Sequence, residues 1–188
     1  MSWNEDAQPN LVTERLLLRP FNRSDAVDVR ELAGDRAIAD TTATIAHPYP
    51  EGAAEAWIST HTAEWQTGSG MTFAVTLREG GGLVGAVGLA IDRSNDSGAL
   101  GYWIGRRHWG RGFATEAAGA VVDYAFRVVG LNRVEADYMT RNPASGRVME
   151  KLGMAHEGVF REALKKWGVF EDVARRAVLK REWETRTR

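Results

Sequence analysis

Hydrophobic and polar positions along this chain follow two periods, one typical of strands and the other typical of helices. Residues 12–19 have the shorter period and predict a strand, which ends at Pro20 because proline cannot donate to a sheet. A helix capped by Ser24 or Asp25 is expected next, and residues 51–66 have the spacing of a longer helix. The opening part of the chain therefore predicts one strand followed by helices.

Two segments between these helices are less clearly patterned. Residues 35–44 are weakly periodic and allow a short helix. Residues 47–50 are expected to be extended, because each proline disfavours helix in the residue before it.

The middle of the chain predicts a meander of three strands and then a helix. Residues 71–77 and 83–91 pair as a hairpin around a glycine-rich turn, and a third strand begins at Leu100. A helix is expected over residues 113–129, with Gly130 ending it. The helix face predicted to point inward consists of Ala114, Ala117, Ala118, Val121, Tyr124, Ala125 and Val128.

The last part of the chain predicts a strand, a short helix and a hairpin. Residues 133–140 alternate as a strand, and Asn142 with Pro143 at the first helical position begins the helix. Residues 154–160 and 169–183 are expected to form the terminal hairpin. The predicted order is β, two or three helices, βββ, α, β, α and ββ, which is typical of an α/β domain on a mixed sheet.

Composition narrows the functional classes. The 188 residues carry a net charge of −1, from 24 basic and 25 acidic side chains, so no global field attracts nucleic acid or an anionic membrane. No cysteine is present, which excludes disulfides, thiolate nucleophiles and cysteine-based metal sites. The four histidines have no metal-ligand spacing, so no metal is expected. The first ten residues are acidic and polar, and we expect a flexible tail over residues 1–10. Residues 11–184 are expected to form a single domain. Because the chain has no long apolar run, a cytoplasmic enzyme is expected.

The junction between the Leu100 strand and the following helix has the features of an anion site. Gly110 and Gly112 let the backbone take positive φ and let an anion approach closely. A helix N-terminus adds free N–H groups and a positive dipole end, and Arg106, Arg107 and Arg111 add charge. A phosphate or pyrophosphate is the expected occupant.

The spacing separates three kinds of phosphate loop. A nucleotide P-loop requires Lys and then Ser or Thr after its second glycine, whereas Arg111 and Gly112 stand here. A dinucleotide fingerprint fails at its last position, Thr115. A formal match within residues 80–85 leads into a strand instead of a helix, so it is a hairpin turn.

What remains is Arg107-x-x-Gly110-x-Gly112, with Ala114 and Thr115 opening the helix. This pattern resembles the acetyl-coenzyme A pyrophosphate loop of the GNAT acetyltransferase superfamily. Further segments resemble its RimJ/RimL-type branch, so that the resemblance covers roughly residues 11–183. These segments are Thr13–Pro20, Tyr102–Gly105, Ala114–Ala117, Asn142–Ser145, Lys151–Met154 and Glu171–Leu179.

The resemblance implies the GNAT acyl-CoA N-acyltransferase fold, a mixed, mostly antiparallel seven-stranded sheet flanked by helices. It implies direct transfer of an acyl group from acetyl-CoA to a primary amine without an acyl-enzyme. The implied acceptor is the α-amino group of a protein or peptide. A homodimer is compatible with it, because relatives are often dimers.

The resemblance also implies the residues that contact the coenzyme. They are Trp103, Ile104, Gly105, Arg107, His108, Trp109, Gly110, Arg111, Gly112, Ala114, Thr115, Asn142 and Ser145. A backbone N–H within residues 103–105, where the strand splays, is the implied oxyanion donor. The alternative is that Gly101 and Gly105 only permit a bulge or close packing.

Asn142 and Ser145 are the candidate catalytic residues, with Ser145 as proton donor to the thiolate. Asn142 is also explained as a helix N-cap and Ser145 as a first-turn residue, and Tyr138 is an alternative hydroxyl. Glu116 in the first helical turn is interpreted as structural. The general base is not evident. His47, Tyr49 and His61 fall on segments of the acceptor side in relatives, and packing or surface roles are favoured for them.

Other functions stay open at this point. An acyltransferase for a small amine, of the aminoglycoside or polyamine type, would be favoured by an acidic acceptor cleft. A non-catalytic CoA-binding sensor module would bind CoA without turnover. Nothing in the sequence fixes the size of the acyl group.

Overall fold

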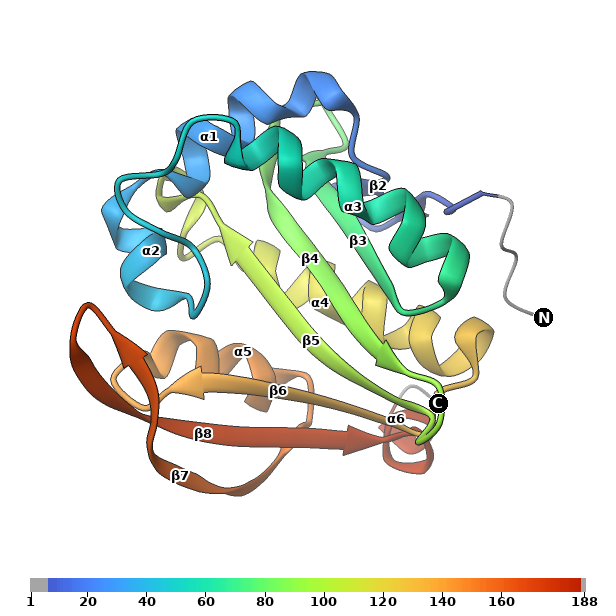
Figure 1. Ribbon diagram of the computed structural model, residues 1–188. Coiled ribbons are helices and arrows are strands. Elements are labelled where there is room, and N and C mark those ends of the chain that lie inside the picture. Colours follow the sequence, from blue (N-terminus) through green and yellow to red (C-terminus); the bar gives the residue numbers. More distant parts are fainter. Residues whose placement is uncertain (1–6, 187–188) are drawn as a thin grey trace.

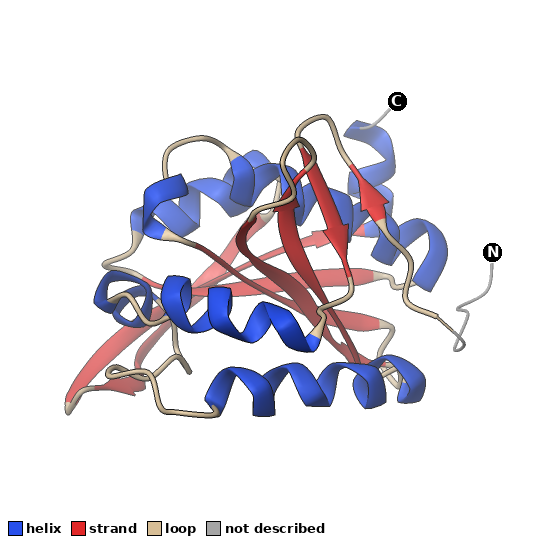
Figure 2. Cartoon of the chain, turned by 90° about the horizontal axis from the view of Figure 1, so that it is seen from above, coloured by secondary structure: helices blue, strands red, loops and turns tan. Residues whose placement is uncertain are grey.

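The computed structural model describes residues 7–186, which form one eight-stranded sheet with helices on its two faces (Figures 1 and 2). The strand order is β1-β2-β3-β4-β5-β6-β8-β7, and every neighbouring pair is antiparallel except β5 and β6. The strands are β1 (Leu11–Val12), β2 (Leu16–Arg19), β3 (Gly70–Leu77), β4 (Leu83–Asp92), β5 (Ser97–Ile104), β6 (Arg133–Met139), β7 (Ala155–Lys166) and β8 (Val169–Leu179). The predicted mixed, mostly antiparallel sheet is confirmed.

The helices divide between the two faces. α1 and α3 pack on one face, mainly against β3 and β4, whereas α4 and α5 pack on the other (Figure 1). The helices are α1 (Ala26–Ala33), α2 (Arg36–Thr41), α3 (Ala53–Thr67), α4 (Phe113–Tyr124), α5 (Pro143–Lys151) and α6 (Lys180–Arg186). Among residues 7–186, no helix combines the length and the apolar character that a membrane span needs.

The predicted number of seven strands was wrong, because the segment predicted as the first strand forms two strands, β1 and β2. After β1 the chain turns, with the Thr13 N–H donating to the Leu16 carbonyl, and β2 pairs back on β1. Of the predicted tail, residues 1–6 lie outside the described residues. Gln8, which follows them, donates from its side chain to the Thr72 carbonyl at 2.9 Å.

The C-terminal hairpin also differs from the prediction. β7 continues beyond residue 160 to Lys166, and Trp167 and Gly168 form the turn with φ of 49° and 85°. β8 ends at Leu179 instead of continuing to residue 183. Its end becomes α6, where the Glu182 carboxylate accepts from the Leu179 N–H at 3.0 Å.

A π-helical turn over Ala125–Val129 extends α4. Because a π turn holds more residues than an α turn, it shifts the phase of the inward face. Val129 is therefore buried, whereas Val128, which the regular spacing placed inward, is half-buried. Gly130 follows with a φ of 83° and ends the helix, as predicted.

The parallel pair β5 and β6 diverges along its length. The two strands are paired only at Ser97–Arg133, Gly98–Val134 and Ala99–Glu135. Beyond these pairs they separate, as Figure 1 shows, while β5 stays paired with β4 up to Ile104. This separation leaves one side of the second half of β5 without a neighbouring strand.

Candidate active site

The loop after β5 has the geometry that an anion site needs. A 3₁₀ turn over Arg106–His108 leads to Gly110 and Gly112, whose φ values are 73° and 81°. Gly112 is the N-cap of α4 and no side chain caps this helix. Glu116 donates the N–H that closes the first turn, onto the Gly112 carbonyl, so the N–H groups before it are available to a ligand.

The basic side chains around the loop differ in whether they already form an ion pair. Arg107 donates to Glu31 at 3.0 Å and to Nε2 of His108 at 3.1 Å. The exposed Arg111 guanidinium stacks over the Phe113 ring, 4.9 Å from its centroid. An anion on the loop can thus recruit Arg111 without breaking an ion pair.

His108 is a neutral neighbour of this loop. Burial lowers its pKa, and the positive charges of Arg107 and Arg111 lower it further. Its Nε2 accepts from Arg107, which places the proton on Nδ1. This environment gives His108 the character of a hydrogen-bond donor and not of a cation.

The open side of β5 presents the backbone of alternate residues. Gly105 N–H donates to the Val84 carbonyl at 2.8 Å, so Gly105 faces β4. In an antiparallel ladder alternate residues bond to opposite sides, so Trp103 also faces β4, whereas Tyr102 and Ile104 face the gap. Of the residues 103–105, Ile104 therefore has its N–H directed to the divergence. Its carbonyl, on the same side, accepts from the Trp109 indole.

Ser145 lies across this gap from Tyr102. The two hydroxyl oxygens are 2.8 Å apart, and the Tyr102 hydroxyl also donates to the Ser145 carbonyl at 3.2 Å. Burial raises the pKa of Tyr102 to about 12, although the bond to Ser145 lowers it. The phenol is therefore neutral at physiological pH and able to donate a proton.

Tyr102 is the site residue that the sequence interpretation missed. It was given only as part of the strand and of the family-like segment Tyr102–Gly105, and its partner lies 43 positions away, so no local spacing connects them. The alternative hydroxyl, Tyr138, packs its ring against Gly146 instead: a Cβ on that glycine would lie 2.9 Å from ring carbons.

Asn142 has the geometry of a helix cap. Its Oδ1 accepts from the Ser145 N–H at 3.3 Å, and its Nδ2 donates to the Thr41 carbonyl at 3.4 Å. Asn142 therefore fixes the start of α5, which carries Ser145, and ties it to the end of α2.

Glu116 has the structural role that was predicted for it. Its carboxylate accepts from the Thr13 hydroxyl at 2.6 Å, the Arg15 N–H at 2.8 Å and Arg15 Nε at 2.7 Å. Although burial opposes it, these bonds lower the pKa of Glu116, so it stays ionised. It fastens the turn between β1 and β2 to the first turn of α4.

The residues predicted on the acceptor side have separate roles. His47 Nδ1 lies 3.1 Å from the Gly34 carbonyl. His61 is buried against Phe21 and Trp57, with ring centroids 5.3 and 4.5 Å away. Tyr49 lines a cleft of about 1260 Å³ that extends over β4 and β5 to Tyr102 and Ser145.

Comparison with known proteins agrees with this fold. The acetyltransferase (GNAT) domain family matches residues 15–155. The structure of Mycobacterium smegmatis RimJ in complex with CoA-disulfide aligns with a TM-score of 0.80 at 26% identity, over 89% of this chain and 83% of that one.

Among relatives, the uncharacterized N-acetyltransferase p20 of Bacillus licheniformis is 36% identical over 117 residues, which is 62% of this chain and 66% of p20. The [ribosomal protein uS5]-alanine N-acetyltransferase of Escherichia coli is 33% identical over 84 residues, 45% of this chain and 43% of that enzyme. The chain thus matches at most about two thirds of the length of either relative.

This mixed sheet, with helices on both faces, places the chain in the class of N-acetyltransferases to which it is similar. The chain belongs to the GNAT acetyltransferase family and, within it, is similar to RimJ/RimL-like members. It is therefore an N-acetyltransferase.

Proposed function

We propose that this chain transfers the acetyl group of acetyl-CoA directly to the α-amino group of a protein or peptide. The observation that carries the proposal is the loop with two left-handed glycines, Gly110 and Gly112, at the uncapped N-terminus of α4, next to the divergence of β5 and β6. Its free N–H groups and Arg111 fit a pyrophosphate. A Cβ at Gly110 would meet no atom within 4 Å, so the loop surface is open to a ligand.

Bound acetyl-CoA supplies an activated thioester and a thiol leaving group. Beside it, the Ile104 N–H stabilises the negative charge that develops on the carbonyl oxygen. The Tyr102–Ser145 hydroxyl pair supplies the proton that the departing sulfur takes up, with Ser145 as donor and Tyr102 behind it. Asn142 positions Ser145 through the helix cap.

The acceptor reaches this point through the cleft over β4 and β5. A peptide acceptor is supported by the uS5-alanine acetyltransferase among the relatives. The α-amino group has a pKa near 8, so about a fifth of it is already neutral at pH 7.4, far more than of a lysine side chain. Such an acceptor needs less help from a general base than a lysine side chain needs.

A small polyamine is the second candidate acceptor, and the charges of the cleft speak against it. Two carboxylates line the cleft, Glu64 and Asp137, and Asp137 is paired with Arg175. One uncompensated carboxylate does not balance the several ammonium groups of a polyamine.

Two measurements test the proposal. Thermal unfolding with CoA, acetyl-CoA, ATP and NAD in parallel should give a stabilisation with the CoA compounds alone, because ligand at a hundred times its Kd adds about 2.7 kcal/mol. Thiol release from acetyl-CoA should then be seen with an alanine-initiated hexapeptide and not with spermidine. Stabilisation by ATP or NAD alone would overturn the cofactor assignment. CoA binding without turnover of any amine would indicate a sensor module.

A further inference from the structure

Arg15 lies in the turn between β1 and β2 and reaches the loop that follows β5. It belongs to the family-like segment Thr13–Pro20, to which the resemblance assigned no role. Its Nη1 donates to the Arg111 carbonyl, 96 positions further along the chain, at 2.9 Å. Its guanidinium stacks over the Phe113 ring, 4.9 Å from the centroid, and a Cβ on Gly112 would lie 3.4 Å from its Nη2. Arg15 therefore lies against three consecutive residues of the segment assigned to the coenzyme phosphates.

The direction of the Arg15 guanidinium is fixed by Glu116. Arg15 Nε donates to Glu116 Oε2 at 2.7 Å, Nη2 lies 2.6 Å from the same oxygen, and the Arg15 main-chain N–H donates to Oε1 at 2.8 Å. Since this carboxylate neutralises the guanidinium, Arg15 is not an unpaired cation that a phosphate could attract. The remaining nitrogen, Nη1, is the one that holds the Arg111 carbonyl.

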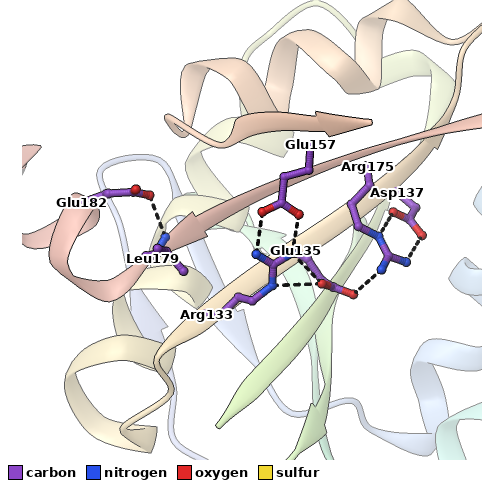
Figure 3. A network of polar contacts seen from close by, with 7 residues as sticks. All are labelled: Arg133, Glu135, Asp137, Glu157, Arg175, Leu179 and Glu182. Atoms are coloured by element: carbon purple, nitrogen blue, oxygen red, sulfur yellow. Dashed lines mark hydrogen bonds and ion pairs between the residues drawn. The ribbon is translucent and has the colours of Figure 1, made fainter. Parts of the chain in front are cut away.

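A larger ionic network on β6, β7 and β8 shows a different use of arginine (Figure 3). There, two arginines donate to carboxylates and so join three neighbouring strands of the sheet. The members of this network are Arg133, Glu135, Asp137, Glu157 and Arg175. Arg15 differs because it also donates to a main-chain carbonyl, and this carbonyl belongs to a loop. Its hydrogen bond therefore acts on the backbone conformation of the loop.

The carbonyl that Arg15 holds belongs to a peptide group with a glycine on each side of its residue. Gly110 and Gly112 flank Arg111 with φ of 73° and 81°, and glycine changes its backbone conformation at little steric cost. In a planar trans peptide group, the Arg111 carbonyl and the Gly112 N–H point in opposite directions. The bond to Arg15 therefore directs the Gly112 N–H away from Arg15. Rotation of this peptide group would place a carbonyl oxygen there instead.

From this geometry we infer that Arg15 is a positioning residue for the coenzyme. It holds the peptide group between Arg111 and Gly112 so that the Gly112 N–H binds the pyrophosphate together with the free N–H groups at the start of α4. This inference rests on the proposed acetyl-CoA-dependent function. Successive main-chain N–H groups in a turn form a concave site for an anion, whereas a carbonyl oxygen at the same point repels it. Arg15 acts through the loop and not through its own charge.

Two substitutions separate the hydrogen bond of Arg15 from its charge. Arg15→Met removes both. Arg15→Lys keeps the charge beside Glu116, but a single ammonium lacks the planar fork that reaches the carboxylate and the Arg111 carbonyl together. The matched control is Arg78→Met, because Arg78 is also exposed and its Nη1 donates at 3.4 Å to a carbonyl of the same turn, that of Thr13. The Kd for CoA is measured by calorimetry at low and at high salt for wild-type protein and the three variants.

Arg15→Met and Arg15→Lys should each weaken CoA binding at least about tenfold, because a hydrogen bond to a charged phosphate is lost. Arg78→Met should bind CoA as wild-type protein does. The loss in the two Arg15 variants should be the same at low and at high salt, since salt screens exposed charges but does not change the direction of a peptide group.

Unchanged CoA affinity in Arg15→Lys and Arg15→Met would overturn the inference while leaving the coenzyme assignment intact. If Arg15→Lys binds CoA normally and the loss in Arg15→Met shrinks at high salt, Arg15 acts by its charge on the phosphates and the positioning role is wrong. Absence of CoA binding to wild-type protein would instead contradict the proposed function.

Discussion

The hydroxyl oxygens of Tyr102 on β5 and Ser145 on α5 lie 2.8 Å apart, across the point where the sheet opens. Because Ser145 must regain a proton when it gives one to the departing sulfur, a proton passed through the pair needs both hydroxyls. Ser145→Ala and Tyr102→Phe should each lower kcat about 10²-fold or more, as is typical when a positioned proton donor is lost. The double variant should be no slower than the slower single variant, since the two groups act as a unit.

The control for these three variants is Tyr124→Phe, which also removes the hydroxyl of a half-buried tyrosine, but one that lies on α4. Its kcat should be that of wild-type enzyme. With a pKa of about 12, Tyr102 should contribute no alkaline limb to the pH–rate profile below about pH 10. Additive effects of the two substitutions would mean that Ser145 and Tyr102 contribute separately.

Gly112→Val should weaken CoA binding at least about tenfold, because a β-branched residue resists the left-handed φ of 81° and the loop N–H groups then lose their common direction. The matched control is Gly80→Val, since Gly80 has a similar φ of 85° in the β3–β4 turn. Both variants should lose stability by about 1–2 kcal/mol, but only Gly112→Val should change the Kd for CoA. Unchanged CoA affinity in Gly112→Val would show that the loop does not bind the coenzyme.

Glu116→Ala should lower the free energy of unfolding by about 2–3 kcal/mol, because it leaves the donors of Thr13 and Arg15 without their charged acceptor. Glu14→Ala, at an exposed neighbouring position, is the control. Since the folded pKa of Glu116 is lowered, its contribution is present above its unfolded pKa and is lost on acidification. Urea unfolding at neutral and acidic pH measures both effects, and equal stability of the two variants would refute the fastening role.

His61 should make stability depend on pH. Burial lowers its pKa below the ordinary 6.5, partly offset by Glu64, and neither ring nitrogen has a hydrogen-bond partner among residues 7–186. The unfolded chain therefore binds a proton that the folded chain excludes, so stability is full above pH 6.5 and falls below it, by at most about 1.4 kcal/mol per pH unit.

Replacing His61 with Phe, which suits the contacts with Phe21 and Trp57, should remove this part of the pH dependence. Urea midpoints of wild-type protein and His61→Phe, compared at about pH 5 and 7.5, measure the difference. The assignment fails if the two proteins lose the same stability on acidification.

Elements that bury one face and expose the other were predicted most accurately from the sequence. The expected helix at residues 51–66 is α3, Ala53–Thr67, and the expected hairpin strands are β3 and β4. β7 was predicted too short, because this edge strand is largely exposed and carries no alternation that a pattern could reveal. The last strand was predicted to continue to residue 183 because Trp183, which lies in α6, fits an alternating pattern as well as a helical one.

The residues of the candidate site likewise fall into those that the sequence could indicate and those that depend on the tertiary fold. The loop after β5 could be proposed as an anion site from the sequence because its glycines, arginines and helix start are neighbours in the chain. Tyr102 was not, because its relation to Ser145 exists only after β5, β6 and α5 have assembled. The direction of Ile104 likewise depends on the register between β4 and β5, which sets the side that each N–H faces.

The divergence of β5 from β6 leaves the amides of Tyr102 and Ile104 without a strand partner, although both belong to a central strand. Amides in such positions normally exchange with deuterium only on opening of the fold. Here the two should exchange rapidly in the free protein, while the flanking amides of Trp103 and Gly105, bonded to β4, remain protected. Coenzyme bound in the gap would slow exchange at Tyr102 and Ile104 and leave exchange at Trp103 and Gly105 unchanged. Hydrogen exchange at these four consecutive alternating amides therefore measures whether the site is occupied.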